Sequence, residues 1–283
     1  MLNQNNSSTA TAIQTGPLSL RDKVIIYGGV FLVSLVGWVY MFYMGWAMEN
    51  MDLVDMWMPP MGGTRAWDVY DFWMLFVMWA VMMVAMMTPS VVPMVMMFAT
   101  INKGKQKKGL PYAPTFIFLS GYLVAWALFS IVASAIQYPL HVSGLLNPMM
   151  NSRSYLLSGG ILVLAGLYQW TPLKDACLTE CRSPLSFLMT SWKEGHWGAL
   201  RLGVHHGLYC IGCCWALMAV LFAVGVMNML WVLLITIFVV LEKIGPVSSR
   251  YLRAVTGLIM VVWGGFWLSL YPWKQYDTWI FLV

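Results

Sequence analysis

Residues suited to binding a soft metal ion are concentrated in one stretch, HHGLYCIGCCWALM, which runs from His205 to Met218. On a helix of about 3.6 residues per turn, a step of four residues drifts by roughly 40°, so residues at such steps form one slanting stripe. The residues at this spacing are His206, Cys210, Cys214 and Met218, with Cys213 flanking them. Imidazole, thiolate and thioether donors together suit Cu(I). The stripe indicates copper binding, although cysteines and the neighbouring glycines also allow membrane helices to pack closely.

A second pair of thiols, Cys177 and Cys181, lies in the sequence CLTEC. Their spacing of four places both on one face if the segment is helical. The charge pattern assigns all five cysteines to the cytoplasmic half, where thiols stay reduced, so metal ligation is favoured over disulfides. Zinc is the lesser alternative to copper, because neither pair has zinc-finger CxxC spacing. If this side faced outward, a disulfide would be expected instead, and the sequence leaves open whether the two pairs meet.

Methionines repeat along the apolar run DFWMLFVMWAVMMVAMMTPSVVPMVMMF. They fall at steps of four in two series, Met74, Met78, Met82 and Met86, and Met83 and Met87. Pro89 and Pro93 follow, and each removes a backbone hydrogen bond and favours a kink. A Met-x-x-x-Met step beside a helix break resembles the selectivity motif of copper-uptake channels, so Met82, Met86 and Met87 are candidate ligands. The alternative is that methionine, a flexible side chain, fills space in a packed helix.

Thioethers and carboxylates also alternate in the loop after the first apolar run, MGWAMENMDLVDMWMPPMGG. The methionines are Met44, Met48, Met51, Met56, Met58 and Met61, and the acids are Glu49, Asp52 and Asp55. A local negative charge would concentrate a soft cation there. We expect Met51, Met56 and Met58 to collect the ion outside the membrane, unless this segment is simply an amphipathic surface.

The elements that must position these residues are transmembrane helices. The 283-residue chain is 60% apolar and only 10% charged, against about 25% charged in soluble domains, and runs of about 20 apolar residues span a bilayer. The predicted spans are 24–44, 72–99, 115–138, 155–171, 206–225, 227–241 and 252–271. The predicted fold is an all-α bundle of about seven spans over residues 24–271, in contact with the lipid bilayer. A polar tail, 1–23, precedes it, and an aromatic segment, 272–283, follows at the outer interface.

Charge placement predicts the orientation of this bundle. With a cytoplasmic N-terminus, thirteen lysines and arginines lie in inner segments and three in outer ones, as the positive-inside rule requires. One inner segment, RSPLSFLMTSWKEGHWGALR, has a helix-start signal at Ser183 and Pro184. Leu185, Leu188, Met189 and Trp192 would share one face of an interfacial helix there. We therefore predict a multi-pass protein of a bacterial inner membrane.

Several function classes lack support in the sequence. Asp71 and the Glu242–Lys243 pair are placed at span ends, so no intramembrane carboxylate of an ion-coupled transporter is expected. No catalytic motif supports an enzyme, and His141 and His196 are expected at the surface or interface rather than as ligands. The net charge of +5 follows from topology and does not indicate nucleic-acid binding.

Four motifs occur in order between Asp71 and Pro246: WAVMMVAMMTPSVVPM, GLYQWTPLKDACLTECRSP, GLYCIGCCWALM and LEKIGP. Together they resemble a bacterial family described as predicted metal-binding integral membrane proteins, domain of unknown function number 2182. The resemblance implies metal binding and assigns no ligands. The first span and the acidic methionine loop lie outside it.

Two hypotheses from different classes remain open at this point. In the first, the protein binds, delivers or transports a soft transition metal, most simply copper, with methionines leading to the thiols at the inner end, and a copper protein is its partner. In the second, it is a non-catalytic accessory subunit of a membrane oxidase or monooxygenase, in which the cysteines and glycines only pack helices against other membrane subunits.

Overall fold

The computed structural model describes residues 18–54, 57–60, 66–147, 150, 152–245 and 249–280, with side chains omitted for 249 and 271–280. Residues 1–17 of the predicted tail lie outside this set, as do Asp55, Met56 and Met61 of the outer methionine loop. Most of the predicted aromatic C-terminal segment is described by its backbone alone.

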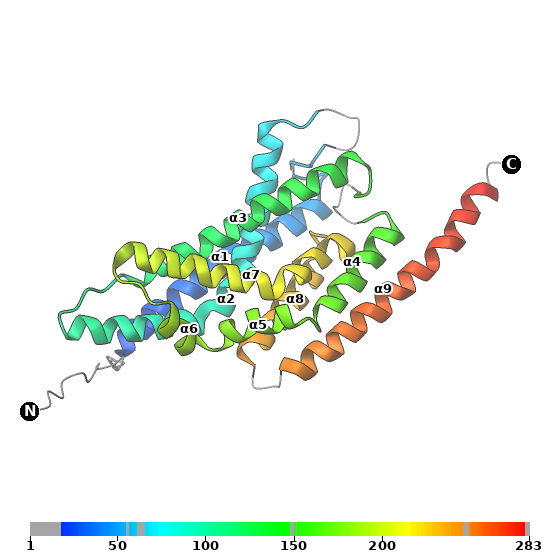
Figure 1. The fold of residues 1–283 in the computed structure, drawn as a ribbon. Helices are drawn as coiled ribbons and strands as arrows, with labels where there is room; N and C mark the ends of the chain where they lie inside the picture. The colour runs from blue at the N-terminus through cyan, green and yellow to red at the C-terminus, as the bar shows by residue number, and fades with distance from the viewer. Residues whose placement is uncertain are drawn as a thin grey trace, which may run out of the picture.

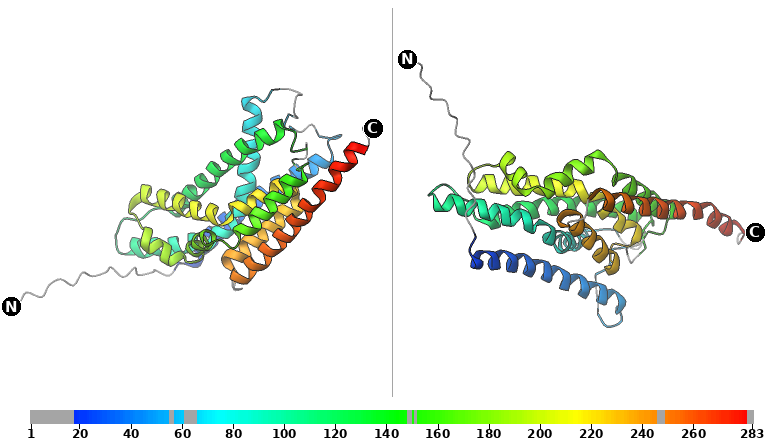
Figure 2. Two further views of the ribbon diagram at one scale, coloured as in Figure 1. Left: turned by 45° about the vertical axis from the view of Figure 1, so that its right-hand side comes forward. Right: turned by 90° about the horizontal axis from the view of Figure 1, so that it is seen from below.

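The described residues form helices and no strand, which confirms the all-α prediction. In chain order the helices are α1 (Leu20–Glu49), α2 (Val69–Lys107), α3 (Thr115–Val142), α4 (Tyr155–Tyr168), α5 (Pro172–Arg182), α6 (Pro184–Ser191), α7 (Gly195–Val224), α8 (Met229–Ile244) and α9 (Ser249–Ile280). Helix α7 occupies the middle of the bundle, with α3 along one side and α4 and α5 against another (Figure 1). Helix α9 packs along α4, and α1 lies at one side against α2 (Figure 2).

Five of these helices are long and apolar enough to cross a membrane: α1, α2, α3, α7 and residues 250–270 of α9. The predicted span 155–171 ends earlier, because Thr171 caps a new helix that begins at Pro172. The resulting pair α4–α5 is bent by 64° and makes a sixth candidate if both halves count as one span. The predicted span 227–241 is α8, an apolar helix of 16 residues. The described helices are compatible with a multi-pass membrane protein of five or six spans, where the sequence suggested about seven.

Close packing between α3 and α7 depends on glycine. A Cβ atom added to Gly203 would overlap the carbonyl oxygen of Phe118, and one added to Gly121 would overlap that of Leu200. A Cβ on Gly207 would lie 2.5 Å from Cβ of Ala125. The packing role considered for the small residues of this stretch therefore holds for its glycines, because small residues bring membrane helices into backbone contact.

The first proline of α2, Pro89, is accommodated by a neighbouring helix. Pro89 has no N–H to donate to the carbonyl of Ala85, and the hydroxyl of Ser34 on α1 donates to that carbonyl instead, at 3.2 Å. Helix α2 continues through both prolines but changes direction along its length (Figure 1). The predicted kink is therefore present, and a hydroxyl from α1 satisfies the exposed carbonyl, as is typical of prolines in membrane helices.

A helix does form in the predicted segment as α6, with Pro184 at its first position. Leu188 is buried, whereas Leu185 and Met189 are exposed. Phe187, which the sequence pattern did not single out, is the other buried residue of this helix. Helix α6 therefore packs one face on the bundle and leaves apolar side chains free for an interface.

Replacement of Gly203 by alanine should destabilise the bundle by about 1–3 kcal/mol, because the added methyl overpacks the α3–α7 interface. Gly265→Ala is the matched control, since nothing lies within 4 Å of its added Cβ. Midpoints of thermal unfolding in detergent would be compared. Equal midpoints for the two variants would contradict the proposed role of Gly203.

Candidate metal centre

The five cysteines, all free, gather where α5 crosses α7. Cys210, Cys213 and Cys214 are buried on α7, and the thiol of Cys181 on α5 interacts with the thiols of Cys210 and Cys213. The Cys177 thiol packs on Gly212, 2.7 Å from the position where a Cβ would stand. The two cysteine pairs, whose proximity the sequence left open, are therefore brought together, and their residues share faces as predicted.

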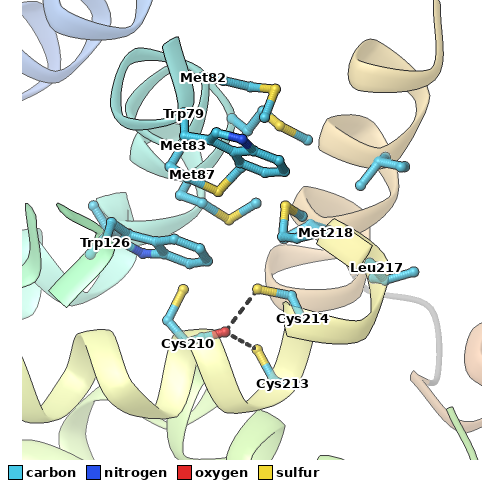
Figure 3. Packing of buried hydrophobic residues seen from close by; sticks show 14 of the residues in the cluster. Trp79, Met82, Met83, Met87, Trp126, Cys210, Cys213, Cys214, Leu217 and Met218 are labelled. Carbon is cyan, nitrogen blue, oxygen red and sulfur yellow. Dashed lines mark hydrogen bonds between the residues drawn. The ribbon is translucent and has the colours of Figure 1, made fainter. Parts of the chain in front are cut away.

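Two of these thiols point at the same backbone atom. Cys213 and Cys214 both donate to the carbonyl oxygen of Cys210, at 3.1 and 2.8 Å (Figure 3). The Cys210 side chain points away from this carbonyl, toward α2 and α3 (Figure 3). The protein therefore concentrates three thiols within one helical turn, a chemistry that soft metal ions such as Cu(I) prefer.

The Cys210 thiol also meets polar groups from two other helices, one of which links it to a third. The ammonium of Lys243 on α8 donates to its sulfur at 2.7 Å, and the Tyr122 hydroxyl on α3 lies 3.1 Å from it. Lys243 also donates to the hydroxyl of Ser90 on α2 at 3.3 Å. The sequence interpretation missed these three residues. A lysine in an apolar helix is itself a signal of function, because charges inside a membrane are costly.

His206 lies one turn before Cys210 and is buried at 3% exposure. Its ring stacks on Phe118 and Tyr122, with centroid distances of 6.2 and 5.8 Å. Its Nδ1 atom has no hydrogen-bond partner. A buried polar atom without a partner needs an explanation, and an ion absent from the coordinates is one of the usual ones. The donor set of thiols and an unpaired imidazole therefore fits a soft metal ion.

The predicted methionines are buried in the core, at 0% exposure for Met82, Met86, Met87 and Met218. Met87 and Met218 lie close to the cysteines between α2 and α7, whereas Met82 lies further from them in the same view (Figure 3). Packing around the Trp79 indole also involves Met83 (Figure 3). The structure therefore places Met87 and Met218 near the thiols, whereas Met82 and Met83 pack around Trp79 in the core, further from the cysteines.

The described residues contain no group of three or more histidine, cysteine, aspartate or glutamate side chains already arranged as metal ligands. This agrees with the hydrogen bonds of Cys213 and Cys214, which direct their thiols to a backbone carbonyl. Binding at this cluster would require these thiols to turn from the carbonyl toward a shared ion.

The outer loop is partly described. Met51 is exposed and Met58 is half-buried, while Met56 lies outside the described residues. The indole of Trp57 donates to the carboxylate of Asp71 at 2.8 Å, and Asp71 is fully buried. Asp71 lies in the first turn of α2, at a helix end as expected, but its side chain is buried and accepts from Trp57 of the loop.

His141 is buried, contrary to the prediction of a surface or interfacial position. The Trp79 indole donates to the side-chain Oε1 of Gln137 at 2.6 Å, so the side-chain Nε2 of Gln137 faces His141 Nε2 at 3.1 Å. His141 therefore belongs to a hydrogen-bonded chain in the core. His196 is exposed, as predicted.

A buried ion pair holds α5 against α8. Lys174 and Glu242 are 2.8 Å apart with both side chains fully buried, and Lys174 also donates to Gln169. The Arg182 guanidinium donates to the carbonyl oxygens of Glu242 and Gly245, at 2.9 and 3.2 Å. Glu242 and Lys243 do lie at the end of α8, as expected, but their side chains are buried, and Glu242 pairs with Lys174 whereas Lys243 donates to Cys210.

The arrangement defines a class of protein: a bundle of long apolar helices enclosing a cluster of thiols, with a lysine and an unpaired imidazole beside it. The chain belongs to the PpoB2 family of copper chaperones, which matches residues 76–267. This range includes all five cysteines, His206 and Lys243. No curated protein and no solved structure matches the chain. The family description names copper and gives no support to the zinc alternative.

Replacement of Glu242 by glutamine should destabilise the protein by about 3–5 kcal/mol, because Lys174 would stay buried without its counter-charge. The double variant Lys174→Met/Glu242→Gln should recover much of this loss. Unfolding in mixed detergent micelles would measure both. Glu194→Gln, which removes an exposed pair with Lys105, should cost no more than about 1 kcal/mol. An effect of Glu242→Gln as small as this control would contradict a structural role for the pair.

Proposed function

We propose that the protein binds Cu(I) at the thiol cluster formed by Cys181, Cys210, Cys213 and Cys214 and delivers it to another protein. The observation that carries this proposal is the convergence of thiols from α5 and α7 beside His206, whose buried Nδ1 has no partner. Thiolate and imidazole are ligands for soft copper. Membership in a family of copper chaperones supports the same conclusion.

Methionines would bring the ion to the thiols. Met87 and Met218 lie between Trp79 and the cysteines (Figure 3). Met82 and Met86 extend the row of methionines along α2. Thioethers are neutral ligands that favour Cu(I), and they can pass the ion on without taking up or releasing protons. Met51, Met56 and Met58 would collect the ion at the outer mouth.

Delivery implies a partner that accepts copper. We place the protein in a bacterial inner membrane with a cytoplasmic N-terminus, on the positive-inside pattern of its lysines and arginines. The resemblance to the predicted metal-binding membrane proteins of domain number 2182 supports this location. The accepting partner is then a copper protein, or a membrane subunit that contains copper.

Copper content is the direct test of the proposed function. Detergent-purified protein, loaded with Cu(I) under anaerobic conditions, should retain about one copper per chain because thiolates bind this ion tightly. The triple variant His206→Ala, Cys210→Ser, Cys214→Ser should lose it. Met189→Leu, which replaces an exposed methionine of α6, is the matched control and should retain copper.

Two outcomes would contradict copper binding at this cluster. A folded triple variant that retains its copper would move the site elsewhere. A wild-type protein that retains none would favour the accessory-subunit hypothesis, and co-purification with an oxidase at fixed stoichiometry would then support it.

Orientation has a separate test with introduced cysteines in a variant whose native cysteines are replaced by serine. Lys107 and Met51 are exposed residues at opposite ends of the molecule. With a cytoplasmic N-terminus, Met51→Cys should react with a membrane-impermeant maleimide in intact spheroplasts, and Lys107→Cys only after permeabilisation. The reverse pattern would overturn the orientation.

A further inference from the structure

Lys243 is a buried cation beside the thiols rather than a partner of a carboxylate. Its side chain extends from α8 to Cys210 and Ser90, at 2.7 and 3.3 Å. Within the described residues no carboxylate lies within ion-pair distance of it, because the adjacent Glu242 is held by Lys174. A buried charge is costly unless a charge of opposite sign balances it. The anion that balances Lys243 must therefore come from the thiol cluster.

The groups that face Lys243 come from every helix around it. Helix α7 presents Cys210, Cys213 and Cys214, α3 presents Tyr122, α2 presents Ser90 and α5 presents Cys181. His206 also interacts electrostatically with Cys210 and Lys243. None of these groups is a carboxylate, so the net charge of the site depends on the thiolates and on the ion that they hold.

We infer that Lys243 is the counter-charge of a Cu(I)–dithiolate formed by Cys210 and one neighbouring thiol, and that it thereby selects a monovalent ion. Cu(I) is stable with two thiolates, which together with the ion carry one negative charge, and Lys243 brings the site to neutrality. A divalent ion such as Zn(II) in the same two thiolates would leave one positive charge in a low-dielectric interior. This inference rests on the proposed function, because it concerns the same cluster.

The test compares affinities for monovalent and divalent ions in Lys243→Met. Purified protein in detergent would be titrated anaerobically with Cu(I) and Ag(I) against a chromophoric chelator, and separately with Zn(II). The variant should lose about tenfold or more in affinity for Cu(I) and Ag(I), because the dithiolate complex keeps an unbalanced charge. Its affinity for Zn(II) should stay the same or rise. The ratio of the two affinities is a readout that a purely structural role would not change.

Three further variants complete the design. Lys243→Arg retains the positive charge and should restore most of the Cu(I) affinity. Lys105→Met removes a lysine of α2 that pairs with Glu194 outside the cluster, and should change neither affinity. If Lys243→Met does not fold, Lys243→Gln replaces it in the same titrations.

The outcomes separate this inference from the proposed function. A wild-type protein without copper rejects both. A wild-type protein that binds copper, with an unchanged ratio of affinities in the neutral variants, rejects only the role of Lys243. An equal loss for Cu(I) and Zn(II), without rescue by arginine, makes Lys243 a structural residue and overturns the inference.

Discussion

The buried pair of Lys174 and Glu242 is the interaction on which the arrangement of the site depends. It holds α5 against α8 where both side chains are fully enclosed, and α5 carries the two thiols that join those of α7. Because it engages Glu242, it also leaves the neighbouring Lys243 directed at Cys210. The electrostatic cost of an unpaired buried charge thus fixes both the position of the two α5 thiols and the lysine that lies beside Cys210.

Around this pair, the glycines and the cysteines of α7 have separate roles. Gly203 and Gly207 lie against α3. The thiols meet groups of α5 and α8, and Cys210 also reaches the Tyr122 hydroxyl of α3. One helix therefore presents a packing face and a chemical face, and the close approach on the first face stacks His206 against Phe118 and Tyr122. The packing interpretation thus holds for the glycines of this helix, while its thiols gather beside Lys243.

Long apolar runs made α1, α2, α3, α7 and α9 predictable, since a span of this length leaves a clear signal in composition. The predicted span 155–171 ended three residues beyond α4, which stops at Tyr168 just before the polar Gln169, and Thr171 and Pro172 then begin the separate helix α5. Lys243 was missed for a geometric reason. Adjacent residues on a helix point about 100° apart, so Glu242 and Lys243, which look like one surface pair in the sequence, face different helices. Which helix each of these side chains faces depends on tertiary packing and leaves no periodic signal in the sequence.

Helix α1 lies outside the range shared with the copper chaperone family, yet the Ser34 hydroxyl satisfies the carbonyl that Pro89 leaves free on α2. Gly37 lies against the same residue, Ala85. Without α1, a bare carbonyl would face the hydrocarbon phase, which cannot hydrogen-bond to it. The proline-containing segment beside the thiols thus requires a hydroxyl donor from outside the shared core, and any chain that lacks α1 would have to recruit such a donor from an adjacent helix.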